Sequence, residues 1–496
     1  MKKCIIIGSG LGGLSCGVML ARNGYDVTVL EQGSQIGGCL QCFKRGGVKF
    51  ETGMHFIGSA SPGQTLDKLM RYLRLDDVKL SQLNPAAYDV VSLSGSQFNF
   101  ANGKEAFIEQ MGGYFPTEKD NIVMYYDIVE RIAQASSLHS LRHAENDMVV
   151  NTFYQTISIN EVLDGLFQDE LLKNVLVGNL PLYAAEKDKT PFSQHAFIMD
   201  FYNQSAYRIV GGSDSISISL CDTITSLGGQ VKPRHKVTKI VCDDTHAIGV
   251  EVNNDEFVSA DLIIADIHPA RVMELLDTKL IRPAFRNRIS TIKNTTAGFS
   301  VYLKFKPNTV PYLNSNFYSF KSDSPWNCET YTDAEWPKGY LYMHLCHEAN
   351  PKFASSGVIL SYMNMEDVEQ WAGTTVGKRG SDYEVFKRAK ADILISSVEK
   401  DFPGLRQYIE SVYTATPLTY RDYTGTEEGS MYGVAKDITL GAACRVPHKT
   451  KVPNLLLTGQ NINSHGMLGV LVGSIVTCSE LLTAETIYQQ IIEANK

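Results

Sequence analysis

A glycine-rich stretch near the start of the chain has the spacing of a phosphate-binding turn. Gly8-Ser9-Gly10-Leu11-Gly12-Gly13 follows the pattern GxGxxG and comes directly after the apolar run 3–7. Gly8 permits a tight turn out of a strand, Gly10 lets the backbone approach a pyrophosphate, and Gly13 lets a helix pack closely on the strand. The free N–H groups at the start of that helix would bind the phosphates. The spacing therefore predicts a dinucleotide site.

The residues after this turn predict the elements that must position it. Residues 14–23 have apolar side chains at helical spacing, and Gly24 is a natural helix cap. Residues 26–30 form a second apolar run that ends in Glu31. An acid there accepts hydrogen bonds from ribose hydroxyls and repels a 2′-phosphate, which excludes an NADP-type adenosine. Strand, turn, helix, strand and acid in register are far more specific than the glycines alone.

Further glycine turns favour FAD over NAD. Gly37-Gly38 closely follows the acid, and Gly53 lies where the chain is expected to return to the cofactor. Much later, residues 452–460 have the pattern of a strand that ends in glycine, and Gly466 and Gly469 open an apolar helix. Turns so far apart in sequence suit a long ligand held at both ends. Since no second GxGxxG follows a strand, a built-in NAD(P)H domain is not expected.

These segments resemble a known family. The chain is similar over most of its length to the phytoene desaturase, carotenoid isomerase and retinol saturase group of the flavin amine oxidase superfamily. The matching motifs are Gly37-Gly38-Cys39, Glu51-Thr52-Gly53-Met54-His55-Phe56-Ile57-Gly58, Gly429-Ser430-Met431-Tyr432-Gly433, and Thr458-Gly459-Gln460 through Gly466 and Gly469. Phytoene desaturases usually carry proline where His55 stands, so this histidine favours the saturase and isomerase branch.

The resemblance implies an FAD-dependent oxidoreductase that saturates, desaturates or isomerises C=C bonds of an apolar, polyene-like substrate such as a carotenoid or retinoid. The motifs and the resemblance together give the expected cofactor-binding residues. They are Gly8, Gly10, Leu11, Gly12, Gly13, Glu31, Gln32, Gly37, Gly38, Gly53, Met54, His55, Val237, Gly459, Gln460 and Gly469. In the family, the residue that matches Val237 contacts the adenine end through its backbone.

Three residues could move a proton beside the flavin. In polyene redox chemistry a hydride passes between a substrate carbon and the flavin, so the protein supplies orientation, an apolar tunnel and one proton at most. A histidine can donate or accept a proton near neutral pH, so His55 is the first candidate acid, with a structural role beneath the flavin as the alternative. His465 lies in the closing flavin turn, and Tyr432 lies between glycines, where it could donate a proton or wall the pocket.

Cys39 and Cys42 form a CxxC pair. This spacing can bind metal or be redox-active. Neither a second cysteine pair nor a histidine pair at metal spacing follows it. Cys39 and Cys42 are therefore expected to be small apolar side chains that fill space in a turn, and no metal site is predicted.

Composition narrows the remaining function classes. The chain has 496 residues, 44% of them hydrophobic and 20% charged, with a net charge of −8. These values are typical of a globular protein of more than one region and argue against a nucleic-acid partner. Glycines interrupt the apolar start, and residues 466–482 suit a core helix better than a bilayer span. We expect a cytoplasmic protein with reduced cysteines, in peripheral contact with membranes where its apolar substrate dissolves.

The expected fold class is α/β, with a Rossmann-type FAD-binding domain interleaved with a mixed α+β substrate domain. The FAD-binding parts are residues 1–84, 206–275 and 445–496. The substrate parts are residues 85–205, where the pattern is mostly helical, and residues 276–444, where strands dominate.

Two other functions compete with this prediction. A flavin amine oxidase usually needs an aromatic cage and a lysine near the flavin. A non-catalytic lipid-binding protein of the GDP-dissociation-inhibitor type shares the fold, but the complete glycine set and Glu31 disfavour it. The electron donor or acceptor, the direction of electron flow and the substrate itself stay open at this point.

Overall fold

The computed structural model describes residues 1–136, 141 and 148–496. A parallel five-stranded sheet lies at its centre, in the order β10-β2-β1-β14-β20. Its strands, in chain order, are β1 (Lys3–Ile7), β2 (Asp26–Leu30), β10 (Gln230–Lys232), β14 (Leu262–Ala265) and β20 (Leu455–Leu457). Strands from the start, the middle and the end of the chain therefore join in one sheet, as the interleaved arrangement predicts.

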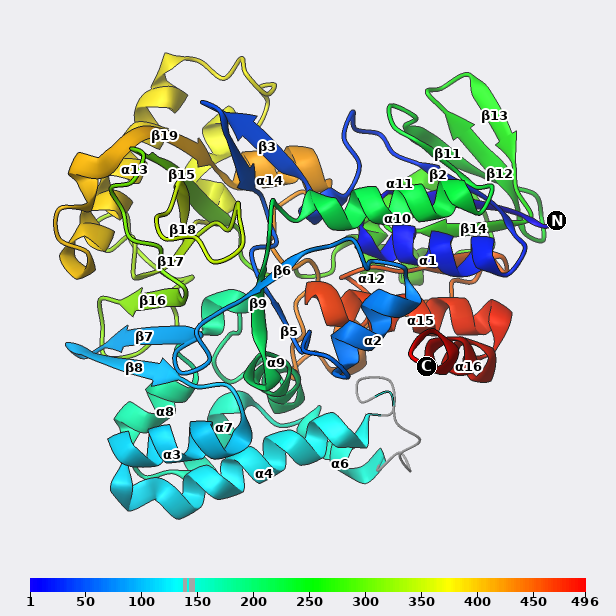
Figure 1. The fold of residues 1–496 in the computed structure, drawn as a ribbon. Coiled ribbons are helices and arrows are strands. Elements are labelled where there is room, and N and C mark those ends of the chain that lie inside the picture. Colours follow the sequence, from blue (N-terminus) through cyan, green and yellow to red (C-terminus); the bar gives the residue numbers. More distant parts are fainter. Residues whose placement is uncertain (137–140, 142–147) are drawn as a thin grey trace.

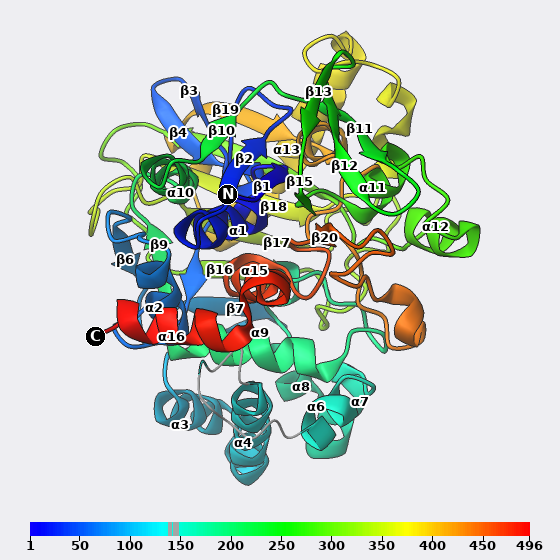
Figure 2. The same ribbon diagram turned by 90° about the vertical axis from the view of Figure 1, so that its right-hand side faces the viewer.

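Both faces of this sheet are covered, which explains why its strands are apolar throughout. Ile6 packs into one core cluster with helices α1 (Leu11–Arg22), α10 (Asp214–Ser226) and α15 (Gly466–Leu482). Ile5 and Ile7 point the other way and pack against the sheet β11 (Val237–Cys242), β12 (Ala247–Val252) and β13 (Glu256–Ser259). Figures 1 and 2 show α1 between α10 and α15. Helices α11 (Pro269–Leu275), α12 (Pro283–Ser290) and α16 (Ala484–Ala494) complete this part.

A second, seven-stranded sheet forms the other half of the molecule (Figure 1). Its order is β19-β15-β18-β17-β16-β7-β8, antiparallel except for the parallel pair β16 and β7. The strands are β7 (Asp89–Leu93), β8 (Ser96–Phe100), β15 (Gly298–Phe305), β16 (Asn316–Phe320), β17 (Gly339–His344), β18 (Ser356–Tyr362) and β19 (Ile409–Ala415). One face packs on α13 (Ser381–Asp401). The opposite face looks toward the centre of the molecule.

Helices cover the far end of the second sheet. They are α3 (Lys104–Tyr114), α4 (Lys119–Ala135), α6 (Met148–Tyr154), α7 (Ile159–Leu166), α8 (Glu170–Leu176) and α9 (Phe192–Gln204). The remaining strands are β3 (Cys42–Arg45), β4 (Val48–Glu51), β5 (Ile57–Gly58), β6 (Leu80–Gln82) and β9 (Ala206–Ile209). The remaining elements are helices α2 (Thr65–Tyr72) and α14 (Pro417–Thr424) and short 3-10 turns at 38–40, 116–118, 180–182, 365–371, 405–408 and 441–444.

The prediction of a mostly helical segment 85–205 was wrong at its start. Strands β7 and β8 form a hairpin there, because Ser94 and Gly95 both take positive φ angles, of 52° and 77°. Two such residues form a tight turn whose twist matches that of paired strands. The flanking residues also alternate between buried and exposed positions in β8, as a half-covered strand does.

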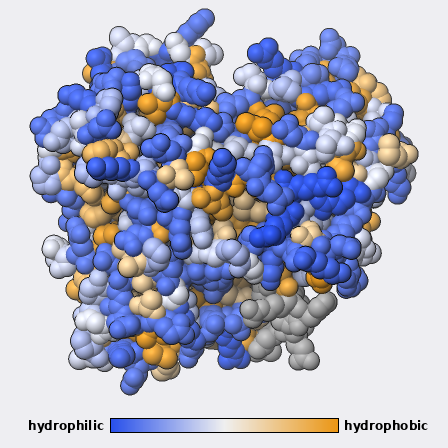
Figure 3. All heavy atoms as spheres, viewed as in Figure 1, coloured by the Kyte–Doolittle hydropathy of each residue, from blue (hydrophilic) through white to orange (hydrophobic). Residues whose placement is uncertain are grey.

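The surface of the face seen in Figure 3 is mainly hydrophilic, with hydrophobic residues in small separate groups and a notch between the two halves. Among the described helices, none is both long enough and apolar enough to cross a membrane. The apolar helix α15 instead lies in the core, with its residues from Met467 to Ile475 buried.

Candidate functional site

The glycine turn after β1 closes tightly around one carboxylate. Asp266, which follows β14, accepts a hydrogen bond from the backbone N–H of Gly13 at 2.7 Å. A Cβ atom added to Gly10 or Gly12 would lie only 2.6 or 2.7 Å from a carboxylate oxygen of Asp266, and one on Gly459 would clash with it too. Three distant turns therefore meet here with no room for side chains, which is the cradle that a pyrophosphate needs.

Glu31 is held facing this turn. Its carboxylate accepts hydrogen bonds from the backbone N–H and the hydroxyl of Ser9, at 3.1 and 2.6 Å, and from the backbone N–H of Gly33 at 2.7 Å. The half-buried group stays accessible at the tip of β2, whereas the neighbouring Gln32 is exposed. Glu31 is thus oriented as the ribose acceptor that its position predicts.

The second glycine turn packs directly on the first. The N–H of Gly37 donates to the carbonyl of Ser9 at 3.0 Å, with φ at +110°. Gly38 lies so close that an added Cβ would be 3.2 Å from the Cα of Gly10. Leu11 begins helix α1 beside these contacts.

The chain before β11 reaches the same end of the sheet. The backbone N–H of His235 donates to the carbonyl of Glu31 at 2.8 Å, and that of Arg234 donates to the carbonyl of Gly33. Val237 begins β11 with its side chain buried, so only its backbone is available to a ligand. These residues fit the adenosine half of FAD.

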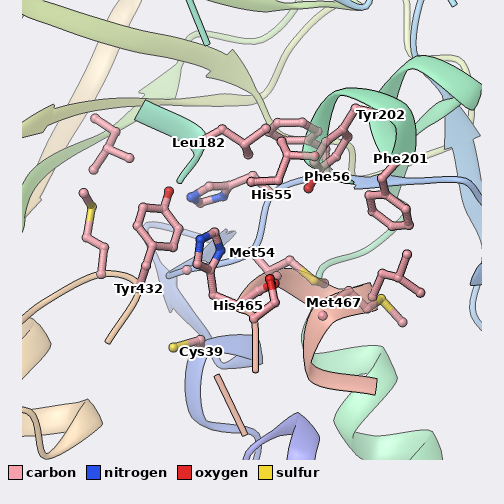
Figure 4. Close-up of a pocket in the computed structure, with 18 of the residues that line it drawn as sticks. Cys39, Met54, His55, Phe56, Leu182, Phe201, Tyr202, Tyr432, His465 and Met467 are labelled. Carbon is pink, nitrogen blue, oxygen red and sulfur yellow. The ribbon is translucent and has the colours of Figure 1, made fainter. Parts of the chain in front are cut away.

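A cavity opens beyond the glycine cradle, and Figure 4 shows its labelled side chains. Its lining includes the predicted residues Gly53, Met54, His55, Tyr432, His465 and Gly469. The seven-stranded sheet contributes Leu341, Met343 and Leu360, and α9 contributes Phe197, Ile198 and Phe201. The structure therefore brings all three candidate catalytic residues to one cavity with mainly apolar walls. Gln460 lies beside Gly433 near this cavity rather than on its lining.

His55 is paired with a buried carboxylate. Its Nδ1 lies 3.4 Å from Oε2 of Glu51, at the end of β4. Burial raises the pKa of Glu51, and the hydrogen bond and charge of His55 oppose that rise. The carbonyl of His55 accepts a hydrogen bond from the buried guanidinium of Arg208 at 3.2 Å, which fixes the backbone of this turn. The ring of His55 therefore lines the cavity with a carboxylate at its Nδ1.

His465 and Tyr432 have different surroundings. The amide Nε2 of Gln194 lies 3.0 Å from Nε2 of His465, and because an amide nitrogen only donates, this ring nitrogen accepts. Burial, together with the nearby charge of Lys436, lowers the pKa of His465 to about 3. The hydroxyl of Tyr432 donates to the carbonyl of Pro181 at 2.8 Å, and its ring lies 4.7 Å from the ring of His465. The hydroxyl proton of Tyr432 is thus engaged by the carbonyl of Pro181, which fits the expected alternative that Tyr432 walls the pocket.

The CxxC pair is a pair of free thiols. Burial raises the pKa of Cys39 to about 11 and that of Cys42 to about 12, so neither is a thiolate at neutral pH. In the part of the chain that the structure describes, no group of three or more His, Cys, Asp or Glu side chains could hold a metal ion.

The sequence-based prediction missed Asp266, Glu51, Gln194 and Arg208. Asp266 carried a usable signal, because it ends a buried strand at the sheet edge where ligands of α/β proteins bind. The partner of a histidine, such as Glu51 or Gln194, comes from tertiary packing and has no such signal. His268 has a structural role, because it caps helix α11 by accepting from the N–H of Ala270.

Comparison with known proteins agrees with this geometry. Residues 11–472 match the family described as flavin containing amine oxidoreductase. An all-trans-retinol 13,14-reductase from Rattus norvegicus is 28% identical over 537 aligned positions, covering 98% of this chain and 86% of the relative. A chloroplastic prolycopene isomerase 2 from an Oncidium hybrid cultivar is 22% identical and covers 97% of this chain and 84% of the relative.

Solved structures share the fold. An oxidoreductase from Methanosarcina mazei superposes with a TM-score of 0.64 at 16% identity, covering 96% of this chain and 100% of that one. A putrescine oxidase bound to putrescine gives a TM-score of 0.62 at 14% identity, with 99% of each chain covered.

Replacing Glu31 with alanine should weaken FAD binding about tenfold to a hundredfold, since a hydrogen bond to a charged group contributes about 1.5–3 kcal/mol. Titration of the apoprotein with FAD, followed by flavin fluorescence, measures this change. The exposed Glu256 of β13 provides a control, and its alanine variant should bind FAD normally. Equal affinity in Glu31→Ala and the wild type would remove Glu31 from the site.

The pH dependence of FAD binding should report on Asp266. Burial, opposed by the hydrogen bond from the Gly13 N–H and reinforced by the charge of Glu31, raises the pKa of Asp266 to about 7. Above that pH a charged carboxylate faces the pyrophosphate, so the dissociation constant for FAD should rise about tenfold between about pH 6 and pH 8. Asp266→Asn keeps an acceptor for Gly13 and should bind with little pH dependence. The same slope in both proteins would contradict this assignment.

Proposed function

This chain belongs to the family of flavin containing amine oxidoreductases, and from that premise we propose that it acts through FAD on the C=C bonds of an apolar polyene. The observation that carries the proposal is the cavity. Its walls come from the sheet and from α9, and it meets the flavin-binding turns at Gly53 and at residues 464–469. A long apolar alkene suits such walls, because each buried carbon gains from leaving water.

The relatives support the choice of substrate class. One is an all-trans-retinol 13,14-reductase and another a prolycopene isomerase. Bound FAD would supply the acceptor or donor of a hydride. The residues of this chain would orient the alkene, exclude water and, for saturation, deliver a proton to the second alkene carbon.

His55 is the residue we assign to proton delivery. It faces the cavity, and Glu51 lies behind its Nδ1 to stabilise the protonated ring. His465 stays neutral and accepts from Gln194, so it orients rather than protonates. Residues on the cavity wall supply the binding surface, and Tyr432 fixes the segment around Pro181.

The family name raises amine oxidation as the second candidate. An amine is a cation in water. To enter an apolar site it must either lose its proton or find an opposite charge. The described cavity lining has no lysine and no carboxylate side chain. We therefore favour a neutral apolar substrate. The non-catalytic lipid-binding alternative is disfavoured because His55 and Glu51 form an acid pair that binding alone would not require.

We also propose the division into functional parts. The five strands of the parallel sheet come from within residues 1–84, 206–275 and 445–496, the segments assigned to FAD binding. Residues 85–205 and 276–444 supply the helices and the second sheet that hold the substrate.

Incubation of chemically reduced enzyme with all-trans-retinol and with other polyenes, under exclusion of oxygen, tests the proposed function. Mass spectrometry of the products distinguishes saturation from isomerisation. A product two mass units heavier supports saturation, while an isomer of unchanged mass supports the isomerase branch. Unchanged polyenes together with turnover of an amine would overturn the proposal.

The variant His55→Ala should keep its FAD and lower the rate of saturation about a hundredfold, because it removes the proton donor while leaving the hydride source. Tyr432→Phe is the matched control. Its hydroxyl is used by the carbonyl of Pro181, so its loss should change the rate much less. Full saturase activity in His55→Ala would reduce His55 to a packing residue.

We propose that the enzyme works in the cytoplasm in peripheral contact with a membrane, since a polyene dissolves in the bilayer. It should then bind weakly to liposomes, and added salt should weaken that binding further. Co-sedimentation with vesicles of neutral and anionic composition measures this. Absence of binding to every composition would argue for delivery of the substrate by another route.

A further inference from the structure

Tyr202 of helix α9 lines the cavity in a position that its neighbours fix. The residue is 8% exposed. Its ring packs on the rings of Phe56 and Phe201, with centroids 4.9 and 5.1 Å away. Its carbonyl accepts a hydrogen bond from Nδ2 of Asn102 at 2.8 Å. Figure 4 shows Tyr202, Phe56 and Phe201 on the side of the cavity away from Tyr432. Packing therefore sets the direction in which the Tyr202 hydroxyl points.

The hydroxyl of Tyr202 differs from the other hydroxyls on the lining. Six lining residues carry one, namely Thr52, Tyr202, Tyr420, Thr424, Tyr432 and Ser464. Five of the six hydroxyls are hydrogen-bonded to a carbonyl or a hydroxyl of the protein, at distances from 2.6 to 3.4 Å. Among the residues that the structure describes, the hydroxyl of Tyr202 has no such partner. Buried polar groups rarely lack partners, so this one indicates a place for a ligand group.

This hydroxyl is also open to a ligand. Tyr318 of β16 carries an unpartnered hydroxyl too, but that atom is inaccessible and the residue does not line the cavity. The hydroxyl of Tyr202 is not among the inaccessible unpartnered atoms. Because Tyr202 lines the cavity, a molecule bound there can reach it.

The surroundings of Tyr202 select the chemical class of that group. Burial raises the pKa of Tyr202, as does the charge of Asp89, so the hydroxyl stays protonated at neutral pH and can both donate and accept. Along the described lining there is no lysine, arginine or carboxylate side chain, so a charged group would be buried without a counter-ion. A hydrocarbon would leave the hydroxyl unpartnered. A neutral oxygen, as in an alcohol or a carbonyl group, avoids both costs.

We propose that Tyr202 binds a neutral oxygen of the polyene and thereby makes the enzyme prefer an oxygenated polyene to a hydrocarbon. The inference rests on the proposed function for the polyene itself and adds a residue that determines specificity. One hydrogen bond at α9 places the oxygenated end of the substrate on that side of the cavity. It also limits how far the chain of double bonds reaches along the apolar wall.

Equilibrium binding to the oxidised, FAD-loaded enzyme tests this role without turnover. The probes are all-trans-retinol, the corresponding aldehyde, the corresponding carboxylate and the hydrocarbon in which hydrogen replaces the hydroxyl. The quantity compared is the affinity for each oxygenated probe divided by the affinity for the hydrocarbon, so that the different apolarity of the probes cancels between proteins. In Tyr202→Phe this ratio should fall about fivefold to tenfold for the alcohol and the aldehyde, which corresponds to a neutral hydrogen bond.

Tyr318→Phe is the matched control, because it removes an unpartnered hydroxyl that no ligand in the cavity can reach. Its ratios should equal those of the wild type. Tyr202→Phe keeps the ring that packs on Phe56, so its melting temperature and FAD content should match the wild type and show that it is folded.

The outcomes separate the role of Tyr202 from the proposed function. Unchanged ratios in Tyr202→Phe, or an equal fall in Tyr318→Phe, would overturn the role of Tyr202 while binding of the hydrocarbon leaves the proposed function intact. Tightest binding of the carboxylate by the wild type would overturn the choice of a neutral oxygen. If none of the polyenes binds to the wild type, the proposed function fails and the inference fails with it.

Discussion

The close approach of two backbone turns to the carboxylate of Asp266 is the constraint on which the rest of the structure depends. Gly10, Gly12 and Gly459 come from the two ends of the chain, and none of them has room for a side chain beside Asp266. The strands that lead into these turns pair in one parallel sheet, so the sheet must assemble from segments throughout the sequence. Once they meet, the end of β20 delivers the chain to residues 464–469, where the cavity opens.

The cavity follows from how the second sheet is placed against this cradle. Its outer face packs on α13 through one core cluster, so its inner face is free to wall the cavity opposite the flavin-binding turns. Charged groups lie behind that wall rather than on it. Glu51 supports His55 from one side, and Arg208 fixes the backbone of His55 from below. An apolar surface with one histidine, for which we propose the role of acid, suits chemistry in which the cofactor carries the electrons and the protein supplies at most a proton.

Local sequence patterns were sufficient for the cofactor site because its requirements are local. The glycine spacing, the second strand and Glu31 lie within a short stretch, and β1 and β2 have the predicted bounds. The apolar helix at residues 466–482 was also predicted correctly. The hairpin of β7 and β8 was missed although Ser94 and Gly95 mark its turn, because its strands were assigned by their helical surroundings.

The partners of His55 and His465 could not be predicted, since Gln194 and His465 lie 271 positions apart. Their pairing is a property of the folded chain and leaves no periodic trace in the sequence.

The central claim is that a polyene reacts with FAD in this cavity. Rapid anaerobic mixing of the photoreduced enzyme with all-trans-retinol, with flavin absorbance and product followed in the same sample, tests that claim most directly. We expect the polyene to change only when the flavin is reduced. For saturation, flavin oxidation and product formation should share one rate and a 1:1 stoichiometry. A polyene that stays unchanged with reduced and oxidised flavin alike, while an amine reduces the oxidised flavin, would contradict the account.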